Sequence, residues 1–171
     1  SIKLINDSNK GSKVIGVVAQ KDEGVENPKF DDIHNIGTVA RILKVLKMPD
    51  GNTTVIIQGK KRFEISQPVS ESPYLKAKIK SVEEIIPEEN NQEFNAAIDS
   101  IKELSLNIIK QSPTIPSEAS FAIKNIESDS FLINFVSSNM AVSVAEKQSL
   151  LTINDLHERA IQTLKHMNVE Y

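Results

Sequence analysis

The sequence predicts an α+β fold in which a β-rich half precedes an α-helical bundle. In the first half, residues 36–65 contain two β-rich runs on either side of Pro49-Asp50-Gly51-Asn52. Asp-Gly between such runs is a strong hairpin signal, because glycine accepts the positive φ that the turn requires. Beyond residue 92 the apolar side chains recur every 3 to 4 positions instead of every second one, which is typical of helices. We expect a β subdomain over 1–80, an acidic linker over 81–92 and a helical bundle over 93–171.

The stretch before the hairpin predicts a short helix, a strand and a loop. Residues 1–9 are interpreted as the end of a helix that Gly11 closes. The apolar run at 13–20 predicts a buried strand, and Gly16 within it indicates a bulge or a close approach of two backbones. Residues 21–35 are polar and acidic, which predicts a loop anchored by Phe30.

The two arms of the hairpin differ in their patterns. Residues 38–47 carry apolar side chains on both faces, Leu43 among them, so we expect this strand to be buried inside a sheet. Residues 53–58 are rich in β-branched side chains, which favour strands. Gly59 is expected to break this second strand before a short third one around Phe63.

The last strand of the first half is predicted over residues 75–80, after a turn-rich connector at 68–73. Leu75, Ala77 and Ile79 alternate with three lysines, so we expect the apolar set to face a core and the lysines to face water. A row of lysines also protects an edge strand against pairing with other chains.

The second half predicts about four to five helices. The first runs from about residue 90 to Gln111, the second starts at Ser117 and the third near Ser128. A last helix begins at residue 154 or 155 and contains no stop signal, so it looks cut within a longer helix. Phe94 belongs to the apolar stripe of the first helix, Phe121 is expected to face inward from the second, and the third carries Phe131 and Phe135. Ser143 and Glu146 have the spacing of a capping box that opens a further short helix.

Composition excludes several classes of protein. The 171 residues are 39% hydrophobic and 25% charged, as in ordinary globular proteins, and the lack of cysteine agrees with a reducing, cytoplasmic compartment. No apolar run approaches the roughly 20 residues that span a bilayer, so we expect no membrane partner. A net charge of −3 and an aromatic content of 5% also argue against nucleic acid as a ligand.

Motifs for catalysis and cofactor binding are missing from the sequence. There is no G-x-x-x-x-G-K-[ST], G-x-G-x-x-G or G-x-S-x-G, so a phosphate cradle, a dinucleotide site and a nucleophile elbow lack support. His34, His157 and His166 show no spacing typical of metal ligands, and the paired carboxylates lie in polar linkers. We expect no catalytic residue, no cofactor-binding residue and no metal ligand in this chain, and a role in binding instead.

Two pairs of neighbouring apolar residues are candidate substrate contacts. Met48 and Pro49 at the hairpin tip would offer an adaptable apolar surface, unless Met48 folds back onto the sheet. Tyr74 and Leu75 follow a Ser-Pro turn and would form a second exposed step, unless Leu75 packs in the core. The basic run at 60–62 suits phosphate, an acidic segment of a partner, or a solvated turn.

The hairpin segment resembles the central part of the amino-terminal domain of bacterial Lon, the ATP-dependent protease family. The family pattern is G-T-x-A-x-I-x-x-x-L-x-x-P-D-G followed by x-V-x-V-x-G-x-x-R. The positions here that match it are Gly37, Thr38, Ala40, Ile42, Leu46, Pro49, Asp50, Gly51, Val55, Ile57, Gly59 and Arg62. GVVAQKD at 16–22, the A-x-K-Q-x-L-L pattern at 145–151 and the D-x-x-E-R-L helix start at 154–159 extend the resemblance over nearly the whole chain.

The resemblance implies a PUA-like, partly closed β subdomain and a helical bundle that leads into a long helix. It also implies a non-catalytic module that captures unfolded or degron-bearing polypeptides and supports a hexamer. The ATPase domain, with its ATP and Mg, and the Ser–Lys serine protease domain would lie elsewhere on the parent chain. The family opens with an L-P-L-x-P-L-R strand, whereas this chain starts at Ser1 inside the first helix, so we expect an uncovered sheet edge.

Two other functions are alternatives. A PUA-type RNA-binding module would need a basic face, against which the acidic balance of the chain argues. A stand-alone Lon-like amino-terminal domain protein would have no protease attached, against which the unterminated last helix argues.

Overall fold

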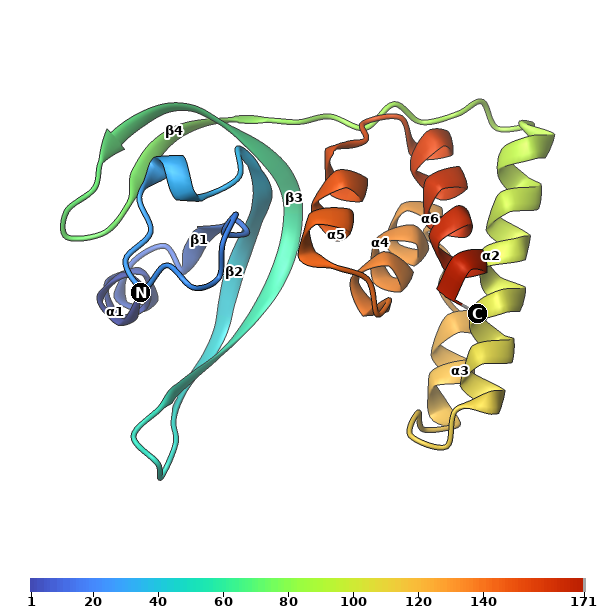
Figure 1. The fold of residues 1–171 in the computed structure, drawn as a ribbon, viewed down its shortest axis with the longest axis horizontal. Coiled ribbons are helices and arrows are strands. Elements are labelled where there is room, and N and C mark those ends of the chain that lie inside the picture. The colour runs from blue at the N-terminus through green and yellow to red at the C-terminus, as the bar shows by residue number, and fades with distance from the viewer. Residues whose placement is uncertain (171) are drawn as a thin grey trace. The chain divides into compact units, whose positions relative to one another are not determined.

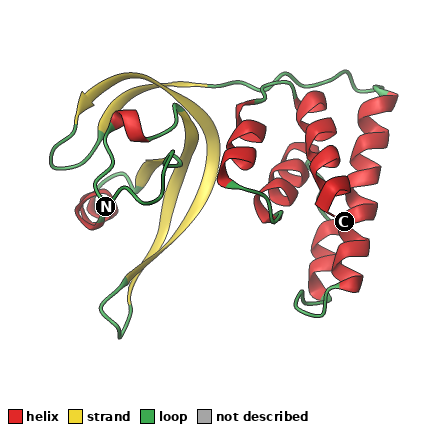
Figure 2. Ribbon diagram, viewed as in Figure 1, coloured by secondary structure: helices red, strands yellow, loops and turns green. Residues whose placement is uncertain are grey.

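An antiparallel sheet forms the first half of the chain and a set of helices forms the second (Figures 1 and 2). The computed structural model describes residues 1–170. The chain divides into two units, Ser1–Glu83 and Glu84 to the carboxyl end. This arrangement confirms the predicted α+β class, with strands first and helices second. None of the described helices is both long enough and apolar enough to cross a membrane.

The first unit consists of a four-stranded sheet with one helix and one short 3-10 turn. The strands follow one another in the order β1-β2-β3-β4, and every neighbouring pair is antiparallel. Hence β1 and β4 are the two edge strands. The elements are α1 (Ile2–Lys10), β1 (Val14–Val17), η1 (Phe30–Asp32), β2 (Ile36–Lys47), β3 (Thr53–Ser70) and β4 (Lys76–Ser81).

The β3 strand corrects two expectations. Gly59 does not break it, because the strand continues from Thr53 through Ser70. Instead the register shifts at this point: Val39 pairs with Lys61 and Ala40 with Gly59, which leaves Lys60 as an extra, bulged residue. The predicted connector at 68–73 is also partly strand, since Pro68 pairs with Ala77 at a second irregularity. Bulges let one strand of 18 residues bend where two shorter ones were expected.

The core of the first unit lies along the part of the sheet where β1 pairs with β2. Ala40, Ile42 and Phe63 are each almost fully buried there. The Phe63 ring needs room next to the backbone, and two glycines provide it. A Cβ at Gly16 would lie 3.0 Å from the Phe63 ring, and one at Gly37 would lie 2.3 Å from the Val17 carbonyl oxygen. The close neighbour of Gly16 is therefore the Phe63 ring and not a second backbone as expected, and β1 pairs with β2 without a bulge there.

Burial differs from expectation at the margins of the sheet. Leu43 in β2 and Ile79 in β4 were expected to be buried, but both are exposed. In the loop before β2, Phe30 is half-buried, and Ile33 is the apolar side chain that is buried. The strand β4 is an edge strand with three exposed lysines, as predicted.

The second unit contains five helices within the described residues. They are α2 (Gln92–Gln111), α3 (Glu118–Lys124), α4 (Asp129–Asn139), α5 (Val144–Thr152) and α6 (Leu156–Glu170). Side-chain caps mark their starts: Asn91 accepts a hydrogen bond from the Phe94 N–H at 2.9 Å, and the predicted capping box of Ser143 and Glu146 is present. The segment before α2 also belongs to this unit, because Ile85 exchanges backbone hydrogen bonds with Asn154 and Leu156.

The bundle core confirms the apolar stripe predicted for α2, Phe94 included, and corrects the inward position expected for Phe121. Ile101 of α2 and Leu132 and Ile133 of α4 are fully buried. Phe121, Phe131 and Phe135 do not face the interior but are exposed, at 73%, 57% and 40% of their surfaces. In α3, Ile123 occupies the core instead of Phe121.

Candidate functional site

The hairpin formed by β2 and β3 extends past its neighbours in the sheet. Strand β1 pairs with β2 only at residues 38–41, and β4 pairs with β3 only from Phe63 onward. Residues 42–61, which we call the hairpin arm, therefore form a two-stranded ribbon whose outer edges meet no other strand within residues 1–170. Figure 1 shows the arm projecting away from the rest of the first unit. Beyond Ile42, which is buried and donates its N–H to the Lys13 carbonyl, such a ribbon exposes both faces and both backbone edges.

Large apolar side chains are exposed along the arm. Leu43, Met48, Ile56 and Ile57 each expose between 41% and 56% of their surfaces. Leu43 is held outward by the local backbone, because Ile42 pairs with Ile57 and Lys44 with Ile56, which leaves Leu43 as a bulged residue. Bulges commonly redirect a side chain next to a functional site. Apolar residues gathered on a projecting element are typical of a surface that binds another polypeptide.

The tip of the arm is a well-defined turn. The Met48 N–H donates to the Asn52 carbonyl at 2.8 Å, and Gly51 has a φ of 86°, which suits glycine. Asp50 accepts hydrogen bonds from the backbone and side-chain nitrogens of Asn52, each at 2.9 Å. These bonds hold the pKa of the Asp50 carboxyl below its usual value, with the backbone bond the larger cause. The turn thus fixes the direction in which Met48 and Pro49 leave the ribbon.

Basic side chains lie between the apolar ones. The arm contains Lys44, Lys47, Lys60 and Lys61 and one acidic residue, Asp50. Its net charge is therefore +3, while the whole chain carries −3, so the remaining residues carry −6. Lys44 lies directly across from exposed Ile56 in the ladder, which places a cation and an apolar side chain side by side on one face.

The structure places the four predicted contact residues in two different positions. Met48 and Pro49 are exposed at the tip, and Tyr74 and Leu75 follow the far end of β3, where both are half-buried. The two pairs thus stand at opposite ends of one 18-residue strand and do not form a single surface.

The Tyr74 side chain is already engaged within the first unit. Its hydroxyl donates to Asp7 Oδ2 at 3.2 Å, and Lys76 Nζ lies 5.3 Å from its ring centroid. Desolvation, and then the nearby Asp7 carboxylate, raise the pKa of Tyr74. These contacts give Tyr74 a structural use, so Met48 and Pro49 are the better placed candidates for binding a ligand.

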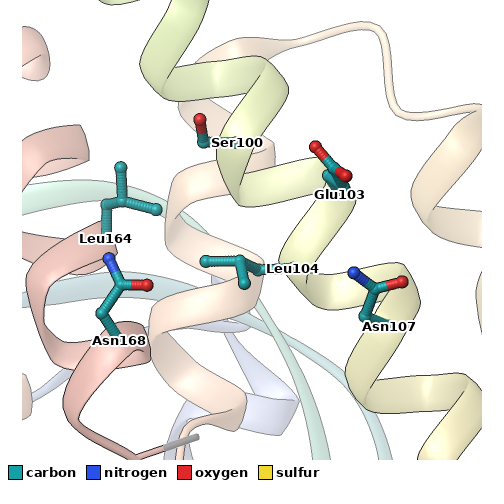
Figure 3. A pocket seen from close by; sticks show the side chains of 6 residues that line it. All are labelled: Ser100, Glu103, Leu104, Asn107, Leu164 and Asn168. Atoms are coloured by element: carbon teal, nitrogen blue, oxygen red, sulfur yellow. The ribbon is translucent and has the colours of Figure 1, made fainter.

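The second unit has a hollow between α2 and α6, lined by Ser100, Glu103, Leu104, Asn107, Leu164 and Asn168. In Figure 3, Leu104 extends toward Leu164 and Asn168, whereas Glu103 projects away from them. Glu103 is the one ionisable residue of this lining, which gives the hollow no pair of groups for acid–base chemistry. Across residues 1–170 no group of three or more His, Cys, Asp or Glu side chains is arranged to hold a metal ion.

Sequence reasoning missed the contribution of Leu43, Ile56 and Ile57. Their alternation looks like that of a buried strand, and only the lengths of β1 and β4 decide that no neighbouring strand covers them. The signal available in the sequence was the pair of lysines at 44 and 47, since a strand buried on both faces rarely carries two charged residues.

Comparisons with known proteins identify relatives for the whole chain. Residues 1–169 match the model of the ATP-dependent protease La (LON) substrate-binding domain. The Lon protease of Flavobacterium johnsoniae is 69% identical over 170 residues, and that of Cytophaga hutchinsonii is 45% identical over 168 residues. These alignments cover 99% and 98% of this chain, but the chain spans only about a fifth (21%) of the length of each relative.

Two solved structures share the fold. The N-terminal domain of a Mycobacterium avium complex Lon protease superposes with a TM-score of 0.70, covering 92% of this chain and 91% of that one. A Lon N-terminal domain protein from Xanthomonas campestris gives a TM-score of 0.65, with 96% and 82% of the two chains covered. Both are 18% identical in sequence, so they support the arrangement of the strands and helices.

Proposed function

Because this chain belongs to the family of substrate-binding domains of the ATP-dependent protease La (LON), we propose that it captures unfolded or degron-bearing polypeptides for a Lon-type protease. In this proposal the chain is a non-catalytic module. ATP hydrolysis, with its Mg, and the Ser–Lys peptidase centre belong to other domains of a longer, cytoplasmic protein. The relatives are about five times as long as this chain, which leaves room for such domains.

The exposed apolar surface of the hairpin arm is the observation that carries the proposal. An unfolded chain differs from a folded one by the apolar side chains and unpaired backbone groups that it presents. The arm offers complementary partners for both: Leu43, Ile56 and Ile57 for side chains, and two open ribbon edges for backbone groups. Met48 at the tip adds a flexible thioether that adapts to different apolar partners.

Binding by one arm is expected to be weak, because the exposed apolar area is small and the bound chain loses conformational freedom. Several copies held in one assembly would raise the effective affinity without new contacts. We therefore include hexamer support in the proposed role. The candidate surface for self-association is the exposed, stacked pair of Phe131 and Phe135, whose ring centroids lie 6.0 Å apart.

The capture role can be tested with one model polypeptide in two states. We expect the chain to bind the unfolded form at least about tenfold more tightly than the folded form. The double variant Leu43→Ser/Ile56→Ser should lose most of this binding. Val69→Ser is the matched control, since Val69 is equally exposed on β3 but lies outside the arm. Equal affinity for the folded and unfolded forms would refute the proposal.

The assembly role needs a separate measurement on the longer protein that contains this chain. Sedimentation should show a smaller oligomer for Phe131→Ser/Phe135→Ser, while Phe121→Ser, exposed on a different helix, should leave the oligomer intact. An unchanged oligomer in the double variant would remove this surface from the proposal and leave the capture role unaffected.

A further inference from the structure

The charge of the hairpin arm points to a preference among polypeptides, which rests on the capture role proposed above. We infer that the arm selects extended segments in which apolar residues are flanked by acidic ones. The arm carries a net charge of +3 while the rest of the chain carries −6, so the projecting element is cationic in a chain that is acidic overall. Such a separation of charge is not needed to keep the chain in solution and favours an anionic ligand at the arm.

Lysines and exposed apolar side chains are neighbours along the arm. Lys44 faces Ile56 across the ladder, and Leu43 precedes Lys44 in the same strand. Directly opposite residues have their Cβ atoms about 5 Å apart, so one bound segment can contact both members of the pair. An apolar residue seated on Ile56 would place a neighbouring carboxylate within reach of the Lys44 ammonium group.

The lysines of the arm are available for such contacts. Lys44, Lys47 and Lys61 are exposed, and no ion pair with an acidic side chain is formed by any of them within residues 1–170. Lys60 Nζ contacts Gln58 Oε1 at 3.0 Å, which leaves its charge uncompensated by a carboxylate. The one acidic residue, Asp50, is directed into the turn by its bonds to Asn52. Hence the arm presents its positive charge outward.

A polypeptide fits this surface better than a nucleic acid or a second copy of the chain. Residues 42–61 contain no aromatic side chain, so bases would find no ring on which to stack. The exposed leucine and isoleucines would meet phosphates, which they cannot bind. A second copy would offer one segment of the matching pattern, in which exposed Ile85 and Ile86 lie between two pairs of glutamates. That segment is already held in place, because the Ile85 backbone bonds to Asn154 and Leu156 and the Glu84 side chain pairs with Arg159.

The experiment uses three unstructured peptides with the same central apolar residues, flanked by Glu, Gln or Lys. Dissociation constants for the 171-residue chain are measured by fluorescence anisotropy at about 0.1 M and about 1 M salt, where the Debye length is about 10 Å and about 3 Å. We expect the Glu-flanked peptide to bind about tenfold more tightly than the Gln-flanked one at low salt, and the difference to fall below about twofold at high salt. The Lys-flanked peptide should bind least.

Lys44→Gln/Lys47→Gln should reduce the preference for Glu flanks to less than about threefold. Lys78→Gln/Lys124→Gln changes the net charge by the same amount at exposed sites outside the arm and should preserve the preference.

If all three peptides bind equally, the acidic preference is wrong but the capture role stands. If none binds, the capture role itself fails. Tighter binding of a single-stranded oligonucleotide, or a salt-sensitive dimer abolished by Lys44→Gln/Lys47→Gln, would also overturn the preference.

Discussion

The buried Arg159 and the half-buried Glu84 form an ion pair that joins the start of the second unit to its last helix. Nη1 of Arg159 lies 2.6 Å from Oε1 of Glu84, and the Arg159 side chain is only 2% exposed. The other guanidinium nitrogens, Nε and Nη2, donate to the Ile153 carbonyl at 3.0 and 2.6 Å. Glu84 also accepts a hydrogen bond from the Ser130 hydroxyl, so one arginine and one glutamate join three segments of the unit.

Arg159→Met should destabilise the second unit strongly. Removing one member of a buried pair leaves the other charge without its main partner, which typically costs about 3–5 kcal/mol of unfolding free energy. Urea denaturation followed by helical circular dichroism measures this loss. Arg41→Met is the control, because Arg41 is exposed on β2 and should change stability by no more than about 0.5 kcal/mol. Equal effects of the two substitutions would show that the ion pair does not hold the segments together.

Leu132→Ala should also weaken the second unit, whereas Phe131→Ala should not. Leu132 is fully buried in the bundle core, so truncation leaves a cavity and costs about 2–5 kcal/mol. Phe131 is the next residue in the same helix, but more than half of it faces solvent. The unfolding free energies of the two variants, compared in one urea series, measure the difference. A larger loss for Phe131→Ala would contradict the orientation of α4.

Gly37→Ala should disrupt the first unit. The added methyl group would lie 2.3 Å from both the Val17 carbonyl oxygen and Val18 Cγ1, and the Val17 carbonyl, being backbone, cannot move without displacing β1. Overpacking of this kind costs about 1–3 kcal/mol. Gly11→Ala is the control, since a methyl group there meets its nearest atom at an ordinary 3.6 Å and the φ of Gly11 is −108°. Amide exchange of β1 and β2 should accelerate in Gly37→Ala alone.

The capping box of α5 predicts a dependence of stability on pH. Hydrogen bonds from the Ser143 backbone and hydroxyl, both at 2.8 Å, lower the pKa of Glu146 from its usual 4.5, and His166 contributes less. A lowered pKa in the folded state stabilises the fold above about pH 4.5, and this stabilisation is lost as the pH falls through the folded pKa.

Wild type should therefore exceed Glu146→Gln in thermal stability at neutral pH, and the difference should shrink in acid. Midpoints of thermal unfolding between about pH 7 and about pH 3 measure this trend. Glu103→Gln, on the surface of α2, is the control and should show no such convergence. A difference that stays constant with pH would mean that the Glu146 charge does not support the cap.

The class and order of the elements could be predicted because each rests on local chemistry. Asp50-Gly51 sets the hairpin, and Asn91 and Ser143 set helix starts through bonds to residues only three positions away. The phase of α4 could not be predicted in the same way. Its apolar residues at 131–133, 135 and 136 surround most of the helix, so contacts with α2 and α6 decide that Leu132 is buried and Phe131 is not.

The exposed arm and the buried arginine escaped prediction for a related reason. Leu43 has the pattern of a core residue, and its exposure follows from where β1 ends, which is a property of another strand. Arg159 has the pattern of a surface residue, and its burial follows from Glu84, 75 positions away in the sequence. Contacts between residues so far apart in the sequence do not change the hydrophobic periodicity of either segment, so that periodicity cannot reveal them.

The way in which the hairpin arm joins the sheet determines how it would respond to tension. Its two strands continue without interruption into the region where β2 is flanked by β1 and β3 is flanked by β4. Suppose that a bound chain is pulled away along the long axis of the arm. The force would then act parallel to the strands on the β1–β2 and β3–β4 ladders, which is a shear load. Several interstrand hydrogen bonds would resist such a load together instead of opening one after another. The tip can therefore bear mechanical force while the ribbon itself remains uncovered.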